Sequence, residues 1–235
     1  MPIFCPHMLR FSEMDRSTAR SLIYDMLAIC YLYPDEKVYG SIAEGEWIIV
    51  FRDALHLLDE KNFDDYLRTF EQAIFGAEEG EQLAMAREYN RLFIHSCPHV
   101  IAPPYGSFYL EKQGLDSAKT TSEVLHFYHE AGFTPKEDLH PDHIAHELEF
   151  MGLLADQESR ASGGGRIRLE EIQMDFLSRY VTPWVPLFCK KVTEQSLLPF
   201  YSILGILTQE FIGFEQNYLG MPEQKDAINN IGLEI

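Results

Sequence analysis

Apolar side chains recur every three or four residues along most of this sequence, and this spacing restricts the fold more than any other feature. It is typical of α-helices with one face turned to a core. No stretch alternates apolar and polar residues between hairpin turns, as a half-buried strand would. The sequence therefore predicts an all-α fold. The clearest run follows Pro199 and consists of Phe200, Ile203, Leu204, Leu207, Phe211 and Phe214.

The chain is expected to form one helical-bundle domain. Its 235 residues show no fixed-period repeat, and 46% of them are apolar, enough for a sizeable core. A stiff loop rich in proline and aromatic residues interrupts the helices at 97–114. A run of glycines predicts a flexible loop at 161–165 within the single domain 1–235. Helices are predicted over about 17–33, 36–58, 62–75, 82–95, 121–131, 141–158 and 169–180, and from 199 onward.

Charge narrows the classes of partner. The sequence has 37 acidic and 19 basic residues, a net charge of −18, which argues against nucleic-acid binding. No run approaches the roughly 18 apolar residues of a membrane span, and no export signal is recognisable at the start. The four cysteines stand too far apart for a disulfide framework. We expect a soluble, cytoplasmic protein with no nucleic-acid partner and no stable membrane insertion.

Two polar residues fall on the apolar face of the helix predicted to start at Pro141. A helical wheel groups Ile144, Leu148, Met151 and Ala155, and Phe150 and Leu154 widen this face. His143 and Glu147 lie inside it, one turn apart, and could pair with each other. Such a pair is either a buried structural pair or part of a binding site, and the pattern alone leaves both open.

A metal or hydrolytic site is the alternative for the same residues. His143, His146 and Glu147 read HxxHE, whereas the zinc-protease motif HExxH places two histidines one turn apart. No third ligand is marked, and HxCxH at 95–99 is not a recognised zinc spacing. Phosphate-loop and GxSxG motifs are absent from the sequence. We therefore predict no metal, no cofactor and no catalytic residue.

Three groups of residues in order resemble the TorD/DmsD/NarJ family of redox-enzyme maturation chaperones. The first joins the YNRLF sequence at 89–93 to PPYGSFY at 103–109. The second is Pro141-Asp142-His143-Ile144 with Glu147. The third comprises Phe176-Leu177, Trp184, Leu187-Phe188 and Pro199-Phe200-Tyr201. Tyr105 and Tyr109 stand where tryptophan is frequent in relatives, and Tyr180 where histidine is.

The resemblance implies a TorD/DmsD-like helical bundle, monomeric or dimeric, that is not an enzyme. Its implied role is to bind the twin-arginine signal peptide and catalytic subunit of a molybdopterin-dependent reductase and to assist cofactor insertion and assembly before export. The peptide-binding residues carried over by position are Tyr89, Leu92, Phe93, Pro104, Tyr105, Tyr109, Pro141, Asp142, His143 and Glu147.

The chemistry of such a peptide agrees with these residues. Arginine pairs with carboxylates, so Asp142 and Glu147 could bind its cationic end, with His143 orienting Glu147. The apolar stretch would need a groove, which a rigid aromatic loop can line. Tyr89, Leu92 and Phe93 could equally be ordinary core residues.

Overall fold

The computed structural model of the chain describes residues 14–43, 46–58, 64–75, 80–97, 99–111, 117–135 and 139–221. Within these ranges the secondary structure is helical, and the sole β feature is an isolated antiparallel bridge between Tyr105 and His143. The all-α prediction is confirmed. Among the described helices, none is long and apolar enough to cross a membrane.

The described residues contain eleven α-helices and two π-helical turns. They are α1 (Arg16–Cys30), α2 (Glu36–Ala43), α3 (Glu46–Leu58), α4 (Asp64–Phe75), α5 (Glu81–Tyr89), η2 (Asn90–Ile94), α6 (Gly106–Glu111), α7 (Ser117–Glu130), α8 (Ile144–Arg160), α9 (Gly164–Phe176), η3 (Leu177–Val181), α10 (Val185–Gln195) and α11 (Pro199–Tyr218).

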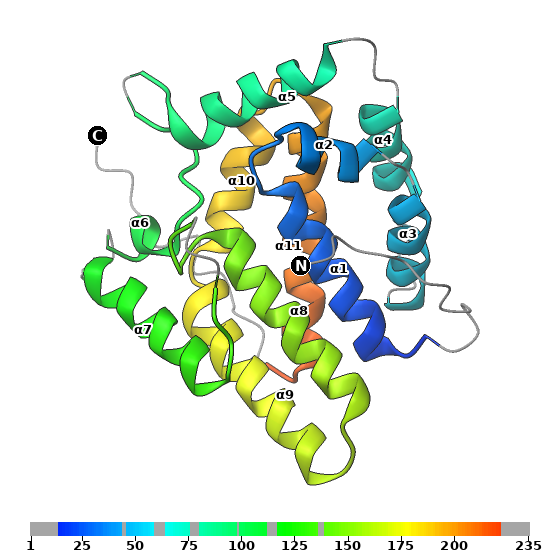
Figure 1. Cartoon of the computed structure of the whole chain (residues 1–235), viewed down its shortest axis with the longest axis vertical. Helices are drawn as coiled ribbons and strands as arrows, with labels where there is room; N and C mark the ends of the chain where they lie inside the picture. Colours follow the sequence, from blue (N-terminus) through cyan, green and yellow to red (C-terminus); the bar gives the residue numbers. More distant parts are fainter. Residues whose placement is uncertain are drawn as a thin grey trace.

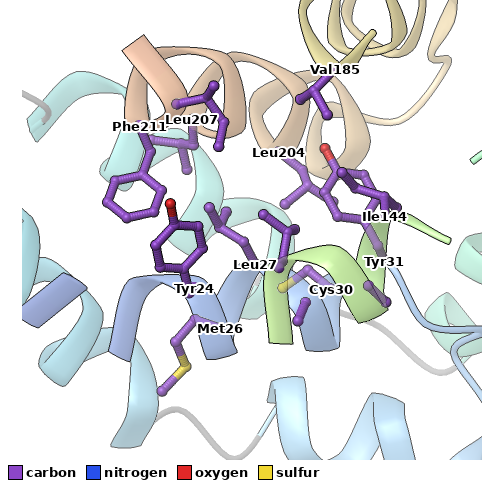
Figure 2. Close-up of a cluster of buried hydrophobic side chains, with 14 of the residues drawn as sticks. Tyr24, Met26, Leu27, Cys30, Tyr31, Ile144, Val185, Leu204, Leu207 and Phe211 are labelled. Carbon is purple, nitrogen blue, oxygen red and sulfur yellow. The ribbon is translucent and has the colours of Figure 1, made fainter. Parts of the chain in front are cut away.

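Helix α1 lies in the middle of the bundle. It packs along α8 and against α3 and α11, and α11 in turn packs against α10 and α4 (Figure 1). The hairpins α8–α9 and α6–α7 complete one side. Apolar burial drives this assembly, and Figure 2 shows side chains from α1, α8, α10 and α11 meeting in one buried cluster. Ile144, the first residue of α8, is part of that cluster, so the start of α8 is anchored in the core.

A buried polar network, which we call the Arg20 cluster, ties four of these helices together. The Arg20 guanidinium is fully buried and donates to both carboxylate oxygens of Glu215, at 2.7 and 2.6 Å, and to Glu158 at 2.6 Å. The other members are Ser17, Tyr24, Gln173, Arg166 and Tyr218, each hydrogen-bonded to Glu158 or Glu215.

The buried base and acids of the Arg20 cluster stabilise one another's charged forms. Burial alone would lower the pKa of Arg20, but the ion pairs with Glu215 and Glu158 raise it. Burial alone would raise the pKa of Glu158, yet hydrogen bonds from Gln173, Ser17 and Arg20 lower it. Paired and hydrogen-bonded in this way, the buried charges fix how α1, α8, α9 and α11 meet.

Several helix boundaries differ from the prediction. The expected helix 36–58 is two helices, α2 ending at Ala43 and α3 starting at Glu46. Helix α7 starts at Ser117, before the expected residue 121. Helix α8 begins at Ile144, not in the turn at Pro141, because the Asp142 carbonyl and the Ile144 N–H bond to the aromatic loop instead.

The glycine run is shorter as a loop than expected. Helix α8 ends at Arg160 and α9 starts at Gly164, so only residues 161–163 join the two helices. Arg166, in the first turns of α9, bonds Glu158 across this connection at 2.8 Å. Whether the loop is flexible stays a prediction. The described cysteines, at positions 30, 97 and 189, are free thiols.

Candidate functional site

The aromatic loop and the start of α8 are bonded into one unit. The Ile144 N–H donates to the Pro104 carbonyl and the Gly106 N–H to the Asp142 carbonyl, both at 2.9 Å, on either side of the Tyr105–His143 bridge. We call this unit, residues 103–109 and 140–147 with Trp184, the loop–helix junction. Two of the segments that resemble the chaperone family therefore meet in space, although more than 30 residues separate them in sequence.

Asp142 holds the loop through its side chain. Its carboxylate accepts the Ser107 N–H at 2.8 Å and the Thr121 hydroxyl at 3.1 Å, which links the start of α6 to α7. The residue is only 1% exposed. Pro141 beside it is partly exposed, and its carbonyl accepts the Tyr128 hydroxyl at 3.0 Å. Asp142 thus acts first as a clamp on the loop.

His143 is the N-cap of α8. Its ring atom Nδ1 accepts the Ala145 N–H at 3.1 Å, so Nδ1 carries no hydrogen and the neutral ring has its hydrogen on Nε2. The side chain is buried, and Nε2 has no hydrogen-bond partner in the described part of the chain. Burial, with His146 and His140 nearby, lowers the pKa of His143 to about 3. The ring is therefore a neutral donor that lacks an acceptor.

Glu147 is bonded to Trp184 and not to His143. Its carboxyl accepts the Trp184 Nε1–H at 3.1 Å, and the residue is 1% exposed. Burial, with Asp142 nearby, raises the pKa of Glu147 well above its usual value, which favours the neutral acid. The predicted pairing of His143 with Glu147 is wrong. The His143 ring caps the start of α8 by accepting the Ala145 N–H and makes no bond to Glu147, one turn further on.

Gly106 allows the loop to approach this pair closely. A methyl group there would lie 3.0 Å from Trp184 Nε1 and 3.2 Å from Glu147 Oε1. The π-helical turn η3 completes the arrangement, since the Tyr180 carbonyl accepts the Trp184 Nε1–H at 2.6 Å. In the sequence, Trp184 stands out only as one of the residues that resemble the family. Its position along the chain does not predict a hydrogen bond to Glu147.

The two tyrosines of this segment, Tyr105 just before α6 and Tyr109 within it, differ in exposure. Tyr105 is partly exposed, and its ring stands edge-on to His143 and His140, with centroids 5.2 and 5.7 Å apart. Tyr109 is 3% exposed and stacks on Trp184 with centroids 5.3 Å apart. The Tyr109 hydroxyl has no partner among the described residues. Tyr105 therefore reaches the surface only in part, whereas Tyr109 belongs to the core.

Tyr89, Leu92 and Phe93 lie in the core and not in the junction. All are at most 3% exposed, and Tyr89 and Phe93 contact each other at 4.9 Å between centroids. Their segment reaches the loop through the backbone, because the Ala102 N–H donates to the Leu92 carbonyl at 2.8 Å. These residues support the loop from beneath.

The surface of the junction is small. Among the residues carried over from the family resemblance, Tyr105 and Pro141 are partly exposed and the others are buried. Exposed His140 and the partly exposed Ser107 and Phe108 border them. The junction can therefore offer a rigid aromatic and imidazole surface, with hydrogen-bonding groups just below it.

The alternative metal or hydrolytic site is not assembled. The part of the chain that the structure describes holds no group of three or more His, Cys, Asp or Glu side chains that could bind a metal ion. His143 is engaged as a helix cap, and Glu147 accepts from Trp184. His146 bonds the His140 carbonyl through Nδ1 at 3.0 Å. Three side chains that are close in sequence thus have three separate partners.

Comparisons with known proteins support a chaperone. The chain is 26% identical to the chaperone protein TorD of Vibrio cholerae over 69% of its length and 76% of the relative's. It is 24% identical to the perchlorate reductase assembly chaperone of Dechloromonas aromatica, over 85% and 89%. The crystal structure of a proposed redox enzyme maturation protein from Archaeoglobus fulgidus shares the fold, with a TM-score of 0.54 at 22% identity, over 91% of this chain and 98% of that one.

The family itself is shown by a further match. The family model described as the nitrate reductase delta subunit matches residues 58–190, more than half of the chain, and this span contains the whole loop–helix junction. Both of these curated relatives are named as chaperones, one of them as a chaperone of perchlorate reductase assembly, and neither is named as an enzyme. The chain therefore belongs to the nitrate reductase delta subunit family, and it is a redox-enzyme maturation chaperone of the TorD type.

Proposed function

We propose that the chaperone binds the twin-arginine signal peptide of the catalytic subunit of a molybdopterin-dependent reductase at the loop–helix junction. Bound in the cytoplasm, the subunit would receive its cofactor and assemble before export. The observation that carries the proposal is the meeting of the aromatic loop with the start of α8, joined by the bridge between Tyr105 and His143.

The junction suits an extended apolar segment. Its backbone is stiff, because two prolines precede Tyr105 and hydrogen bonds fix the loop on both sides. A rigid aromatic side chain loses little conformational entropy when a ligand packs on it. Tyr105 and Pro141, partly exposed, are the side chains that such a segment would touch first.

The arginine end of the peptide was expected to pair with Asp142 and Glu147, but the structure favours another mode of recognition. Asp142 and Glu147 are both buried, and burial raises the pKa of Glu147, which favours its neutral form. Neither carboxyl therefore presents a charge at the surface of the junction. The net charge of −18 still attracts a cationic peptide at long range. We expect arginine binding to depend mainly on this long-range attraction, which salt weakens.

A titration tests the proposal. The probe is a synthetic peptide with two adjacent arginines followed by about 12 apolar residues, the size of a signal-peptide apolar region. Tyr105→Ala should weaken its binding by about tenfold or more, because a central aromatic contact is lost, and should leave the melting temperature close to wild type. Binding should also weaken as salt rises.

Tyr66→Ala is the matched control. Tyr66 is 39% exposed and lies on α4, across the bundle from α6 and the junction (Figure 1). It should bind the peptide as wild type does. Equal affinities of wild type and Tyr105→Ala would contradict the proposed site. Tyr109→Ala is unsuitable as a test, because Tyr109 stacks on buried Trp184 and its loss would disturb the fold.

A further inference from the structure

The buried imidazole of His143 carries a hydrogen that nothing in the described structure accepts. Its Nδ1 is occupied by the Ala145 N–H, so the hydrogen must sit on Nε2. Nε2 is buried without a partner, in a residue that is 1% exposed. Unpaired buried donors are rare because they lose their bonds to water, and those that persist call for an explanation.

Tyr105 is the side chain that faces this imidazole from the loop. Its ring stands edge-on to the His143 ring, and the bridge between the two residues holds their backbones in place. The flanking bonds from Ile144 and Gly106 leave the Tyr105 backbone little freedom. The Tyr105 side chain is nevertheless partly exposed, so it can rotate toward solvent without moving the loop.

The kind of group that would satisfy Nε2 follows from its chemistry. An N–H donor needs an oxygen acceptor and repels another donor such as a guanidinium. An extended peptide presents a main-chain carbonyl at every residue, and this group needs no particular side chain. The imidazole therefore suits the backbone of a bound segment and not its arginines.

We propose that His143 donates a hydrogen bond from Nε2 to a main-chain carbonyl of the bound client segment, and that the Tyr105 ring is a gate that swings aside to expose it. This inference rests on the proposed function, since it names the atom that recognises the client at that site. It assigns His143 a recognition role that is independent of Glu147. It also explains why the junction keeps an unpaired donor in the free protein.

Two substitutions at His143 separate its two hydrogen bonds. In His143→Asn the side-chain oxygen can replace Nδ1 as the cap, because asparagine is a favoured N-cap, but nothing reaches the position of Nε2. In His143→Gln the longer amide can place a donor near that position while the cap is lost. The first variant should fold as wild type does and bind the twin-arginine probe peptide about tenfold more weakly, the effect of one lost hydrogen bond. The second should melt earlier and bind nearly as wild type does.

The gate is tested without any peptide. Nitrogen-15 NMR of the free protein reports how fast the His143 Nε2 hydrogen exchanges with water. Tyr105→Ala should speed this exchange, whereas Tyr66→Ala should leave it unchanged, because Tyr66 lies on α4, across the bundle from the junction (Figure 1).

Each outcome decides one part of the inference. If His143→Asn binds the probe peptide as tightly as wild type, Nε2 does not contact the client and the donor role is wrong. If Tyr105→Ala leaves the exchange unchanged, Tyr105 is not the gate. If wild type binds no twin-arginine peptide while Tyr105→Ala speeds the exchange, the proposed function fails and the gate is upheld.

Discussion

Two polar clusters lie in the same helical core, and they are built in opposite ways. In the Arg20 cluster, buried Arg20 has carboxylate partners in Glu158 and Glu215, which receive further hydrogen bonds from neighbouring polar side chains. In the loop–helix junction, equally buried His143 and Tyr109 each keep a polar atom without a partner in the described structure. Burial is therefore similar in the two clusters, whereas hydrogen-bond satisfaction is not.

The difference separates a structural role from a functional one. A fully paired network gains nothing from a further partner, so the Arg20 cluster serves to fix four helices against each other. A donor without an acceptor makes the free state less stable than it could be, and a ligand that supplies the acceptor removes that cost. Changes to the first cluster should therefore lower stability, whereas changes to the second should mainly alter binding.

The largest effect is expected from Arg20→Met. It removes the cation shared by Glu158 and Glu215 and leaves the buried carboxylates without their main partner. Breaking a buried ion pair in this way should lower the free energy of unfolding by about 3–5 kcal/mol, measured by urea denaturation. Arg160→Met is the control, because Arg160 pairs with Asp156 at the surface and is 74% exposed. Its loss should change stability by less than about 1 kcal/mol. Equal effects of the two variants would mean that the Arg20 cluster does not fix the fold.

The next comparison uses a glutamate-to-glutamine substitution in each of the two clusters. Glu215→Gln removes a charge that Arg20 and Tyr24 both bond, and should cost about 2–3 kcal/mol. Glu147→Gln replaces an acid whose pKa burial raises, which favours the neutral form, and its amide oxygen can still accept the Trp184 N–H. We expect that variant to lose less than about 1 kcal/mol at pH 7.

The stability difference between Glu147→Gln and wild type should also depend on pH in a definite direction. Because the folded pKa of Glu147 is raised, the wild type loses stability as the pH rises from the usual value of 4.5 toward the folded pKa. Glutamine does not titrate. Glu147→Gln should therefore gain on wild type between pH 4.5 and 7 in the same urea series. A large loss at pH 7 would show that Glu147 is ionised in the fold.

The contrast between these clusters marks what could be predicted from the sequence. Helical spacing predicted the fold and the buried face of α8, where Ile144, Leu148 and Met151 are fully buried. Short motifs also picked out both halves of the junction. These features are local, since each depends on residues within a few turns of one another.

The parts that were missed depend on contacts between distant segments. Arg20 lies in an apolar helix, and its partner Glu215 is 195 residues away, so no spacing rule pairs them. The pairing of His143 with Glu147 was wrong because helical position alone could not show that Trp184 would reach Glu147 from another helix. Tertiary packing decided both cases, and a single sequence does not encode it in any local pattern.

The next prediction concerns the loss of stability at acid pH that His143 causes in the junction. The pKa of His143 is lowered to about 3, so the unfolded chain takes up a proton near the usual 6.5 that the folded chain refuses. The stability that neutral His143 contributes is complete above pH 6.5 and is lost as the pH falls toward 3, by up to about 1.4 kcal/mol per pH unit. His143→Asn should therefore lose less stability than wild type between pH 6 and 4. His126→Asn, at a side chain 74% exposed, is the control and should follow wild type. Parallel curves for His143→Asn and wild type would mean that the imidazole accepts a proton without unfolding.

The smallest effect concerns two buried tyrosines. The Tyr24 hydroxyl donates to Glu215 at 2.9 Å, whereas the Tyr109 hydroxyl has no partner in the described structure. Tyr24→Phe should cost about 1–2 kcal/mol, because it removes a hydrogen bond to a buried carboxylate. Tyr109→Phe removes a hydroxyl that is already unpaired, so it should be neutral or stabilise the protein by up to about 1 kcal/mol. Both variants keep the aromatic ring, so differences in packing are minimal. If Tyr109→Phe instead destabilises the protein as much as Tyr24→Phe, the hydroxyl has an acceptor such as a bound water, and the junction is as well satisfied as the Arg20 cluster.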